Sequence, residues 1–396
     1  MSEWIITTVG KLGKVVTGKT PSKNNPEDWG NEYLFITPSD YGNYNKSANH
    51  SIRGLSEEGY KRHKVRMIPK HSCLVTCIGS DMGKVVMNAE DAFCNQQINA
   101  LIPNTSIIDS DYAYYFFKDS ALILKTLGSD GTAVPILNKS DFEKIELSIP
   151  PLPEQKAIAS VLSSLDDKID LLHRQNKTLE AMAETLFRHW FIEEAKEDWE
   201  ELSVSDIAIH IKDNVNPSKD PLKTFYHFSL PAFDSGQKPT SELGSEILSN
   251  KYRVSKNSIL VSKLNPRVPR IWLVSNVEDN YVCSTEFQNL KPKVTAHLMF
   301  LYSLFNSRDV IDELTMSASG TSGSHQRVKP EDMLNITFRT PSLDYLEQYS
   351  SLIAPSMQKV ASNKQQIKTL ENLRDTLLPK LMSGEVRVQY QTEEVA

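Results

Sequence analysis

Residues 150–190 read PPLPEQKAIASVLSSLDDKIDLLHRQNKTLEAMAETLFRHW, and this stretch predicts one long helix. The prolines at its start end whatever element comes before them. Apolar side chains then recur in steps of four and three residues, with Asn176 as a polar member of the row. Such heptad spacing is typical of a helix that packs along another helix. The predicted seam consists of Ile158, Leu162, Leu165, Ile169, Leu172, Asn176, Leu179 and Leu186.

An internal repeat predicts a second helix of the same kind. The residues KTLE at 177–180 return at 368–371, an offset of 191 residues, and the same offset relates Asp141 to Asp332 and Pro150 to Pro341. Further matches follow in the same order along the chain, which indicates a tandem duplication. The second helix is therefore expected over residues 343–382. Its predicted seam consists of Ile353, Val360, Asn363, Ile367, Leu370 and Leu377, with Ser356 and Arg374 at polar interruptions.

The length of these helices indicates what covers their apolar rows. A helix of about 40 residues is about 60 Å long and overhangs a domain of this size. An apolar stripe is most often buried against the helix's own domain. Two overhanging stripes in one chain, however, most simply bury each other, and repeated copies joined in this order pair antiparallel. Asn176 and Asn363 are then polar seam residues that can fix the register.

The expected fold class is α+β, with two tandem mixed α/β domains separated by two long helices in an antiparallel coiled coil. The segments before each helix contain short runs typical of strands, such as residues 34–36 and 73–76, with glycine turns between them. The expected layout is a first mixed domain at 1–150, a helix at 151–197, a second mixed domain at 198–342, a helix at 343–383 and a tail at 384–396.

The composition bounds the class of protein. The 396 residues include 39% hydrophobic and 24% charged residues, as in globular proteins. No apolar run approaches the ~18 residues of a membrane span, and the amino terminus shows no signal peptide, so the sequence predicts a cytoplasmic protein without a membrane partner. The four cysteines, Cys73, Cys77, Cys94 and Cys283, fit a reducing compartment.

The net charge of −6 argues at first against a nucleic-acid partner. Counted by segment, however, residues 1–150 and 198–342 each carry a net charge of only −1. Basic residues gather at 61–70 in the first domain and at 251–270 in the second, beside glycine, proline and asparagine loops. A charge run usually marks a solvated face, but equivalent clusters in both copies favour two phosphate-facing surfaces.

The sequence contains few motifs that are typical of catalytic sites. Residues 13–20, GKVVTGKT, match the phosphate-binding loop pattern, but the following PSKNNP cannot start the helix that such a loop needs. His71, Cys73, Cys77 and Cys94 lack the paired spacing of a zinc site, and buried small apolar side chains are the better interpretation of the cysteines. We expect no metal site and no catalytic residues, which indicates a binding and assembly protein.

Several motifs resemble one known family. GKTPS at 18–22, Gly131-Thr132, PPLPEQ at 150–155, LDDKI at 165–169 and LMSGEVRV at 381–388 are similar to the specificity subunits of type I restriction-modification systems. The resemblance covers the whole chain, including its duplication. In the second copy the PPLPEQ junction becomes PSLDYLEQ at 341–348.

The resemblance implies a non-catalytic subunit that determines DNA specificity. Two target-recognition domains would each read one half of a bipartite double-stranded DNA site, and the two helices would set the spacer and bind two methylation subunits. No cofactor is then expected on this chain. S-adenosylmethionine would belong to the methylation subunits, and ATP and Mg to the restriction and translocase subunits.

Residues near the basic clusters are the candidate DNA contacts. Lysine and arginine suit phosphates, and amides or guanidinium groups form bidentate pairs with base edges. The candidates are Lys19, Thr20, Ser22, Lys61, Arg62, Lys84, Gln96 and Gln97 in the first copy, and Lys263, Asn265, Arg267, Arg270, His325, Gln326 and Arg327 in the second. Two alternatives stay open: a nucleotide-binding hydrolase that uses the loop from Gly13 to Thr20, and a coiled-coil adaptor without DNA contact.

Overall fold

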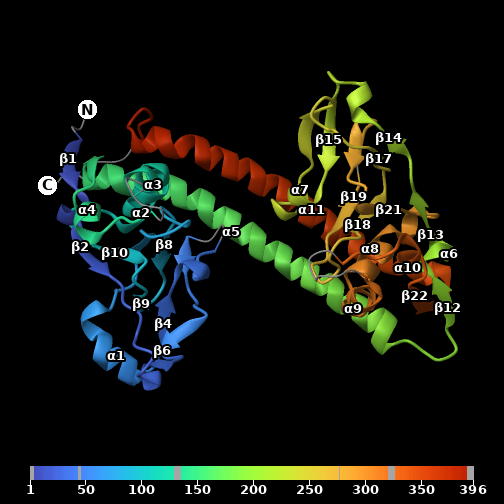
Figure 1. Ribbon diagram of the computed structural model, residues 1–396, viewed down its shortest axis with the longest axis horizontal. Coiled ribbons are helices and arrows are strands. Elements are labelled where there is room, and N and C mark those ends of the chain that lie inside the picture. The colour runs from blue at the N-terminus through green and yellow to red at the C-terminus, as the bar shows by residue number, and fades with distance from the viewer. Residues whose placement is uncertain (1–3, 43–45, 129–134, 276, 320–325, 390–396) are drawn as a thin grey trace. The chain divides into compact units, whose positions relative to one another are not determined.

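The computed structural model describes residues 4–42, 46–128, 135–275, 277–319 and 326–389. Its two long helices, α5 (Leu152–Arg188) and α11 (Leu343–Met382), are the green and red helices of Figure 1. The chain divides into two units. Unit 1 contains Met1–Arg174 and Asn363–Ala396, and unit 2 contains Gln175–Ser362, so each unit holds one part of each long helix.

Unit 1 begins with a β-rich domain. A five-stranded sheet has the order β2-β10-β7-β8-β5, a four-stranded sheet has the order β3-β6-β4-β9, and β1 pairs with β11. The elements are β1 (Ile5–Thr8), β2 (Gly13–Thr17), β3 (Trp29–Gly30), β4 (Tyr33–Ile36), β5 (Ser47–Ala48), β6 (Arg53–Leu55), α1 (Glu57–His63), β7 (Cys73–Thr76), β8 (Val85–Asn88), β9 (Ala92–Cys94), β10 (Ile98–Pro103), α2 (Ser110–Asp119), α3 (Ala121–Gly128), α4 (Lys139–Glu143) and β11 (Glu146–Ile149).

Unit 2 is built in the same way. Its sheets have the orders β13-β21-β18-β19 and β14-β17-β20-β15-β16, and β12 pairs with β22. The elements are β12 (Glu200–Ser203), α6 (Val204–Ile207), β13 (Ala208–Ile211), β14 (Asn214–Val215), β15 (Thr224–Phe228), α7 (Leu230–Asp234), β16 (Thr240–Leu243), β17 (Lys251–Arg253), β18 (Ser258–Ser262), β19 (Ile271–Val274), β20 (Tyr281–Cys283), β21 (Phe287–Pro292), α8 (Leu298–Asn306), α9 (Arg308–Ser317), α10 (Pro330–Leu334) and β22 (Thr337–Thr340).

The tandem repeat reappears in the strand pairing. β4 runs parallel to β9 with Ile36 opposite Cys94, and β15 runs parallel to β20 with Phe228 opposite Cys283. Backbone hydrogen bonds repeat as well: the amide of Val9 donates to Ile145, and the amide of Val204 donates to Ile336. All four cysteines are buried, which confirms their interpretation as small core residues.

The long helices pack antiparallel within each unit, as the expected fold class requires. In unit 1, Ile169 and Leu172 of α5 form a buried cluster with Ile367 of α11, while Ile158, nearer the start of α5, shares a core with Leu381. In unit 2, Phe187 lies 5.9 Å from Tyr349, measured between ring centroids. Partner numbers fall as the numbers of α5 rise, which defines an antiparallel pair.

The side chains at the predicted seam differ in burial. The buried ones are Ile158, Leu162, Ile169, Leu172, Asn176, Ile353, Val360, Asn363 and Ile367, and the partly buried ones are Leu165, Leu179, Leu186, Leu370 and Leu377. Asp166, which the heptad spacing does not include, is also buried. It forms an ion pair with Arg374, one of the polar interruptions noted in the second helix.

Different contacts at the starts of α5 and α11 account for the altered junction sequence of the second copy. Gln155 accepts from the amide of Asp109 and donates to the carbonyls of Ile107 and Pro150, and Glu154 pairs with Arg387 of the tail at 2.5 Å. The positions 191 residues later are Tyr345 and Leu346. The ring of Tyr345 forms an edge-to-face contact with Trp199, and Leu346 is fully buried. An aromatic and aliphatic contact in unit 2 therefore replaces a polar one in unit 1.

Phe187→Ala tests how much unit 2 depends on the helix in its core. Phe187 is buried and lies within 6 Å of the rings of Phe191, Phe300 and Tyr349. Removing its ring should lower the free energy of unfolding by about 3–5 kcal/mol. Urea denaturation measures this loss, and Met182→Ala on the exposed side of the same helix is the matched control. An equal effect of both substitutions would contradict burial of Phe187 in the core.

Candidate nucleic-acid interface

Three segments of unit 1 meet beside the ends of strands and bring several candidate residues together. We call residues 18–24, 77–84 and 95–97 the first loop cluster. The amide of Lys19 donates to the carbonyl of Cys94 at 2.9 Å, and the hydroxyl of Thr20 donates to Oε1 of Gln96 at 2.8 Å. The amide of Cys77 donates to the carbonyl of Gln97 at 2.7 Å. The side chain of Lys19 is exposed beside this frame.

Gly18 permits the close approach of two of these segments. A Cβ atom at this residue would lie 2.2 Å from the carbonyl oxygen of Asn95, so only glycine fits. Residues Gly13–Thr17, the start of the GKVVTGKT pattern, form strand β2, which is hydrogen-bonded to β10. A phosphate-binding loop instead wraps its amides around the phosphates and leads into a helix. The strand geometry therefore argues against the nucleotide-hydrolase alternative.

The other basic candidates of unit 1 already have acidic partners. Lys84 pairs with Asp81 at 2.7 Å at the end of the β7–β8 hairpin. On α1, Lys61 pairs with Glu58 at 3.0 Å, and Arg62 pairs with the buried Asp28 at 2.9 Å. Arg62 thereby anchors α1 to the segment before β3.

Arg66 is a cation beside the first loop cluster that is not among the candidates predicted from the sequence. Its guanidinium donates to the carbonyl of Thr17 at 2.7 Å, at the end of β2. The signal was present, because Arg66 closes the basic run at 61–66. The spacing of that run, however, does not reveal which of its cations turns toward the loops. Ser22 is exposed in the segment at residues 18–24, where its hydroxyl accepts a hydrogen bond from the amide of Asn24.

Unit 2 repeats this frame with different residues. We call residues 262–270, 284–287 and 326–328 the second loop cluster. The amide of Lys263 donates to the carbonyl of Glu286, as Cys77 donates to Gln97 in unit 1. The amide of Asn265 donates to the carbonyl of Gln326, as that of Gly79 donates to Pro135. Asn265 has a φ of 50° and Gly79 a φ of 90°, so both copies place a left-handed residue at this turn.

The charged side chains of the second loop cluster differ in their partners. Arg327 forms a bidentate pair with Glu286 at 3.1 and 3.2 Å. Arg270 forms one with Asp234 at 2.7 and 2.8 Å, and this hydrogen bonding lowers the pKa of Asp234. Arg267 is exposed and forms no ion pair with any residue that the structure describes. His325 lies outside the described residues.

His210 lies on β13, near Lys263 of the second loop cluster, and is not among the candidates predicted from the sequence. Neither ring nitrogen has a hydrogen-bond partner among the described residues. Burial, together with Lys212 and Lys263, lowers its pKa to about 4. The imidazole is therefore neutral at pH 7. A lone histidine within a strand carries no pattern that would have singled it out.

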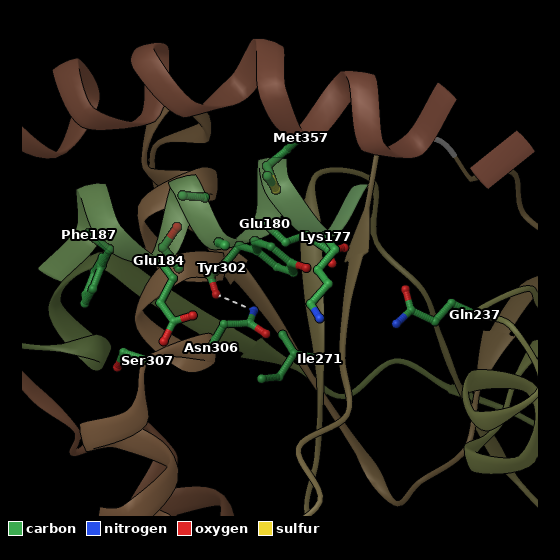
Figure 2. A pocket seen from close by; sticks show the side chains of 13 residues that line it. Lys177, Glu180, Glu184, Phe187, Gln237, Ile271, Tyr302, Asn306, Ser307 and Met357 are labelled. Carbon is green, nitrogen blue, oxygen red and sulfur yellow. Dashed lines mark hydrogen bonds between the residues drawn. The ribbon is translucent and has the colours of Figure 1, made fainter. Parts of the chain in front are cut away.

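A cavity of about 420 Å³ lies in unit 2 between α5, α8 and α11 (Figure 2). Glu180, Glu184 and Lys177 of α5 face it together with Tyr302 and Asn306 of α8. The described residues contain no group of three His, Cys, Asp or Glu side chains that could share a metal ion.

The described helices include none that is long and apolar enough to cross a membrane.

Comparison with known proteins relates the whole chain to one family. The model of the type I restriction modification DNA specificity domain matches residues 1–181. The type I restriction enzyme MjaIX specificity subunit of Methanocaldococcus jannaschii is 28% identical over 98% of this chain and 94% of its own length. The HindI specificity subunit of Haemophilus influenzae is 35% identical over 37% of this chain and 32% of that protein.

A solved structure has the same fold. The S subunit of a type I restriction-modification system from M. genitalium superposes with a TM-score of 0.64 at 19% identity, and the alignment covers 96% of both chains.

The titration of His210 predicts a pH dependence of stability. The unfolded chain binds this proton near pH 6.5, but the folded chain binds it only near pH 4. The contribution of His210 is therefore complete above about pH 6.5 and is lost as the pH falls toward 4. His210→Val, which places the valine of the equivalent strand position in β2, should reduce the loss of stability between pH 7.5 and pH 5. Urea denaturation at both pH values measures it, and parallel profiles for variant and wild type would refute it.

Proposed function

We propose that this chain, which belongs to the DNA specificity subunits of type I restriction-modification systems, reads its target in two halves, one through each loop cluster. Residues 1–150 and 198–342 are then the two target-recognition domains. Residues 151–197 and 343–383 are the spacer helices, and residues 384–396 form a tail. The family carries no cofactor of its own, so chemistry on the DNA belongs to other subunits.

The repeated hydrogen-bond frame is the observation that carries this proposal. Both clusters hold the same backbone arrangement, yet Cys77 is matched by Lys263, Gly79 by Asn265 and Gln97 by Glu286. A constant frame with exchanged side chains is suited to present two different base-reading surfaces. Two such surfaces on one chain would read two short sites separated by unread base pairs, as dimeric proteins read half-sites.

The candidate residues are assigned to three kinds of DNA contact by their side-chain chemistry and by the acidic partners that they already have. Lys19, Arg66 and Arg267 are proposed as phosphate contacts, since phosphate contacts position a protein on DNA. Gln96, Gln97, Asn265 and Gln326 are proposed as base readers through their amides. The remaining candidates, Thr20, Ser22, Lys61, Arg62, Lys84, Lys263, Arg270, His325 and Arg327, are proposed as secondary contacts, and the paired ones would have to exchange an acidic partner for phosphate.

The proposed assembly contains further subunits. Two methylation subunits with S-adenosylmethionine would bind the helices, and restriction and translocase subunits would supply ATP- and Mg-dependent cleavage. These partners would also supply positive charge, because the chain carries a net charge of −6 and DNA binding depends on neutralised phosphates. The proposed location of the complex is the cytoplasm.

Methylome sequencing tests the proposal directly. A host that expresses this chain with its cognate methylation subunit should acquire one bipartite adenine-methylated motif. Gln96→Ala should relax the sequence of one half of that motif, and Gln326→Ala should relax the other half. Each lost base contact is worth about 1–3 kcal/mol of discrimination. A contiguous motif, or relaxation of the same half by both variants, would refute two-site reading.

Lys19→Ala tests the phosphate contacts. The assembled methylation complex should bind all sequences more weakly, and the slope of log affinity against log salt should fall by about one. The matched control is Lys144→Ala, an exposed lysine of the same unit whose side chain pairs with Asp141 outside the first loop cluster. Fluorescence anisotropy over a series of salt concentrations measures both. Equal slopes for wild type and Lys19→Ala would show that Lys19 does not contact phosphate.

A further inference from the structure

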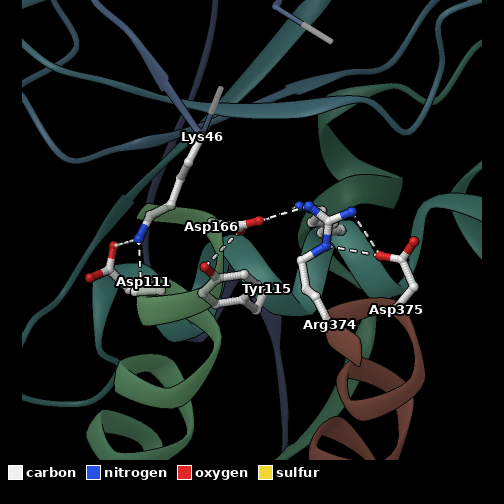
Figure 3. A network of polar contacts seen from close by, with 8 residues as sticks. Lys46, Asp111, Tyr115, Asp166, Arg374 and Asp375 are labelled. Atoms are coloured by element: carbon white, nitrogen blue, oxygen red, sulfur yellow. Dashed lines mark hydrogen bonds and ion pairs between the residues drawn. The ribbon is translucent and has the colours of Figure 1, made fainter. Parts of the chain in front are cut away.

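A buried carboxylate in unit 1 connects the recognition domain to both long helices. Asp166 lies on α5, and its side chain is 3% exposed. It accepts a hydrogen bond from the hydroxyl of Tyr115 at 2.8 Å, lies 3.4 Å from Nζ of Lys118, and binds Nη1 of Arg374 at 2.7 Å (Figure 3). Tyr115 and Lys118 belong to α2, and Arg374 belongs to α11. These four residues are called the Asp166 node.

Neighbouring contacts hold the node in place. Asp375 binds the other edge of the Arg374 guanidinium at 2.8 Å. Lys46 of the loop before β5 donates to Ser163 of α5 at 2.9 Å and pairs with Asp111 of α2 at 2.7 Å. The recognition domain is therefore attached to α5 by polar contacts from two segments that are far apart in sequence.

The charges of the node are largely removed from water. The side chain of Arg374 is 12% exposed and that of Lys118 is 25% exposed. Burial, with the nearby Arg374, lowers the pKa of Lys118, although Asp166 opposes this. A single carboxylate thus serves two cations and a hydroxyl. Such a group satisfies its partners in one arrangement only, because displacement of either helix leaves a buried charge unpaired.

The second copy of the repeat shows that the fold does not need charges here. At the offset of 191 residues, Asp166 corresponds to Met357 and Arg374 corresponds to Ala183. Met357 and Ala183 are buried in the apolar core of unit 2. Both residues also line the cavity of Figure 2, where a small alanine takes the position of an arginine. The same pair of helices can evidently pack at this level with apolar side chains.

We infer that the Asp166 node sets the register of α5 against α11 and the orientation of the first recognition domain on them, and thereby the number of unread base pairs between the half-sites. This inference rests on the proposed function. Apolar packing is non-directional and tolerates small shifts, whereas a buried polar group in a helix seam selects one register. The node is a positioning device for DNA specificity and touches no base.

The double variant D166M/R374A tests the inference, because it installs the residues of the second copy at both positions. Replacing a buried ion pair with apolar side chains is often neutral or stabilising. Lys118 also loses its partner in this variant, but its side chain is 25% exposed and can turn its ammonium group to water, so the protein should fold. With the cognate methylation subunit, both half-sites should stay unchanged. Methylation at sites whose spacer is one base pair longer or shorter should rise about tenfold relative to the wild-type spacer, or ~1.4 kcal/mol.

Leu172→Ala is the matched control for a merely structural effect. Leu172 is buried in the apolar cluster with Ile169 and Ile367, so its truncation weakens the helix pair without removing a directional contact. Its thermal midpoint should fall while the spacer stays unchanged. If D166M/R374A folds and assembles but keeps the wild-type spacer, or if Leu172→Ala relaxes the spacer equally, the inference is wrong.

A second measurement reads the register without DNA. Leu171 and Leu373 are half-exposed residues of unit 1 on α5 and α11, and the four native cysteines are buried. Spin labels on Leu171→Cys and Leu373→Cys should give one narrow distance distribution by electron resonance, and D166M/R374A should broaden it. An unchanged distribution overturns the register claim. Absence of a bipartite motif with the wild-type chain, together with a broadened distribution, would reject the proposed function alone.

Discussion

Mutual burial of the apolar rows of α5 and α11 is the constraint on which the rest of the structure depends. In each unit the parts of these helices do more than pair with each other, because they also complete the core of the β-rich domain. Ile158 and Leu162 of α5 share a core with α2 and β7 in unit 1, and Phe187 shares one with α8 in unit 2. Each β-rich domain therefore has a helical surface built into its core, which fixes the domain on the long helices of its own unit.

The duplicated backbone arrangement also explains how the two units can present two different surfaces. Strand pairing and backbone hydrogen bonds repeat between the units, because the buried backbone N–H and C=O groups need hydrogen-bond partners in both copies. The side chains at the ends of the loops are not needed for these hydrogen bonds, so they can differ between the copies. Gln97 and Glu286 occupy the same place in the frame, but the second is engaged by Arg327. The side chains can change there without a change of fold.

Acidic partners neutralise part of the basic clusters. Several cations selected from the basic clusters are held by acidic partners within their own unit, as Arg62 is by Asp28 and Arg270 is by Asp234. A basic run therefore overstates the positive charge available to a nucleic acid. Lys19 and Arg267 are exposed, and they lie on loops next to Gly18 and near the left-handed Asn265, respectively.

The amino-acid sequence alone was sufficient for the fold class and the duplication, and it indicated a family, because heptad spacing, an offset of 191 residues and the PPLPEQ junction are local or periodic signals. It also predicted Asn176 and Asn363 as polar members of the apolar rows, and both side chains are buried. Only the tertiary structure brought Lys19, Thr20 and Gln96 into one cluster and joined Asp166 to Tyr115, Lys118 and Arg374. Those contacts join residues 48 to 208 positions apart, and no period in the sequence encodes which distant partner a charged side chain meets once the chain has folded.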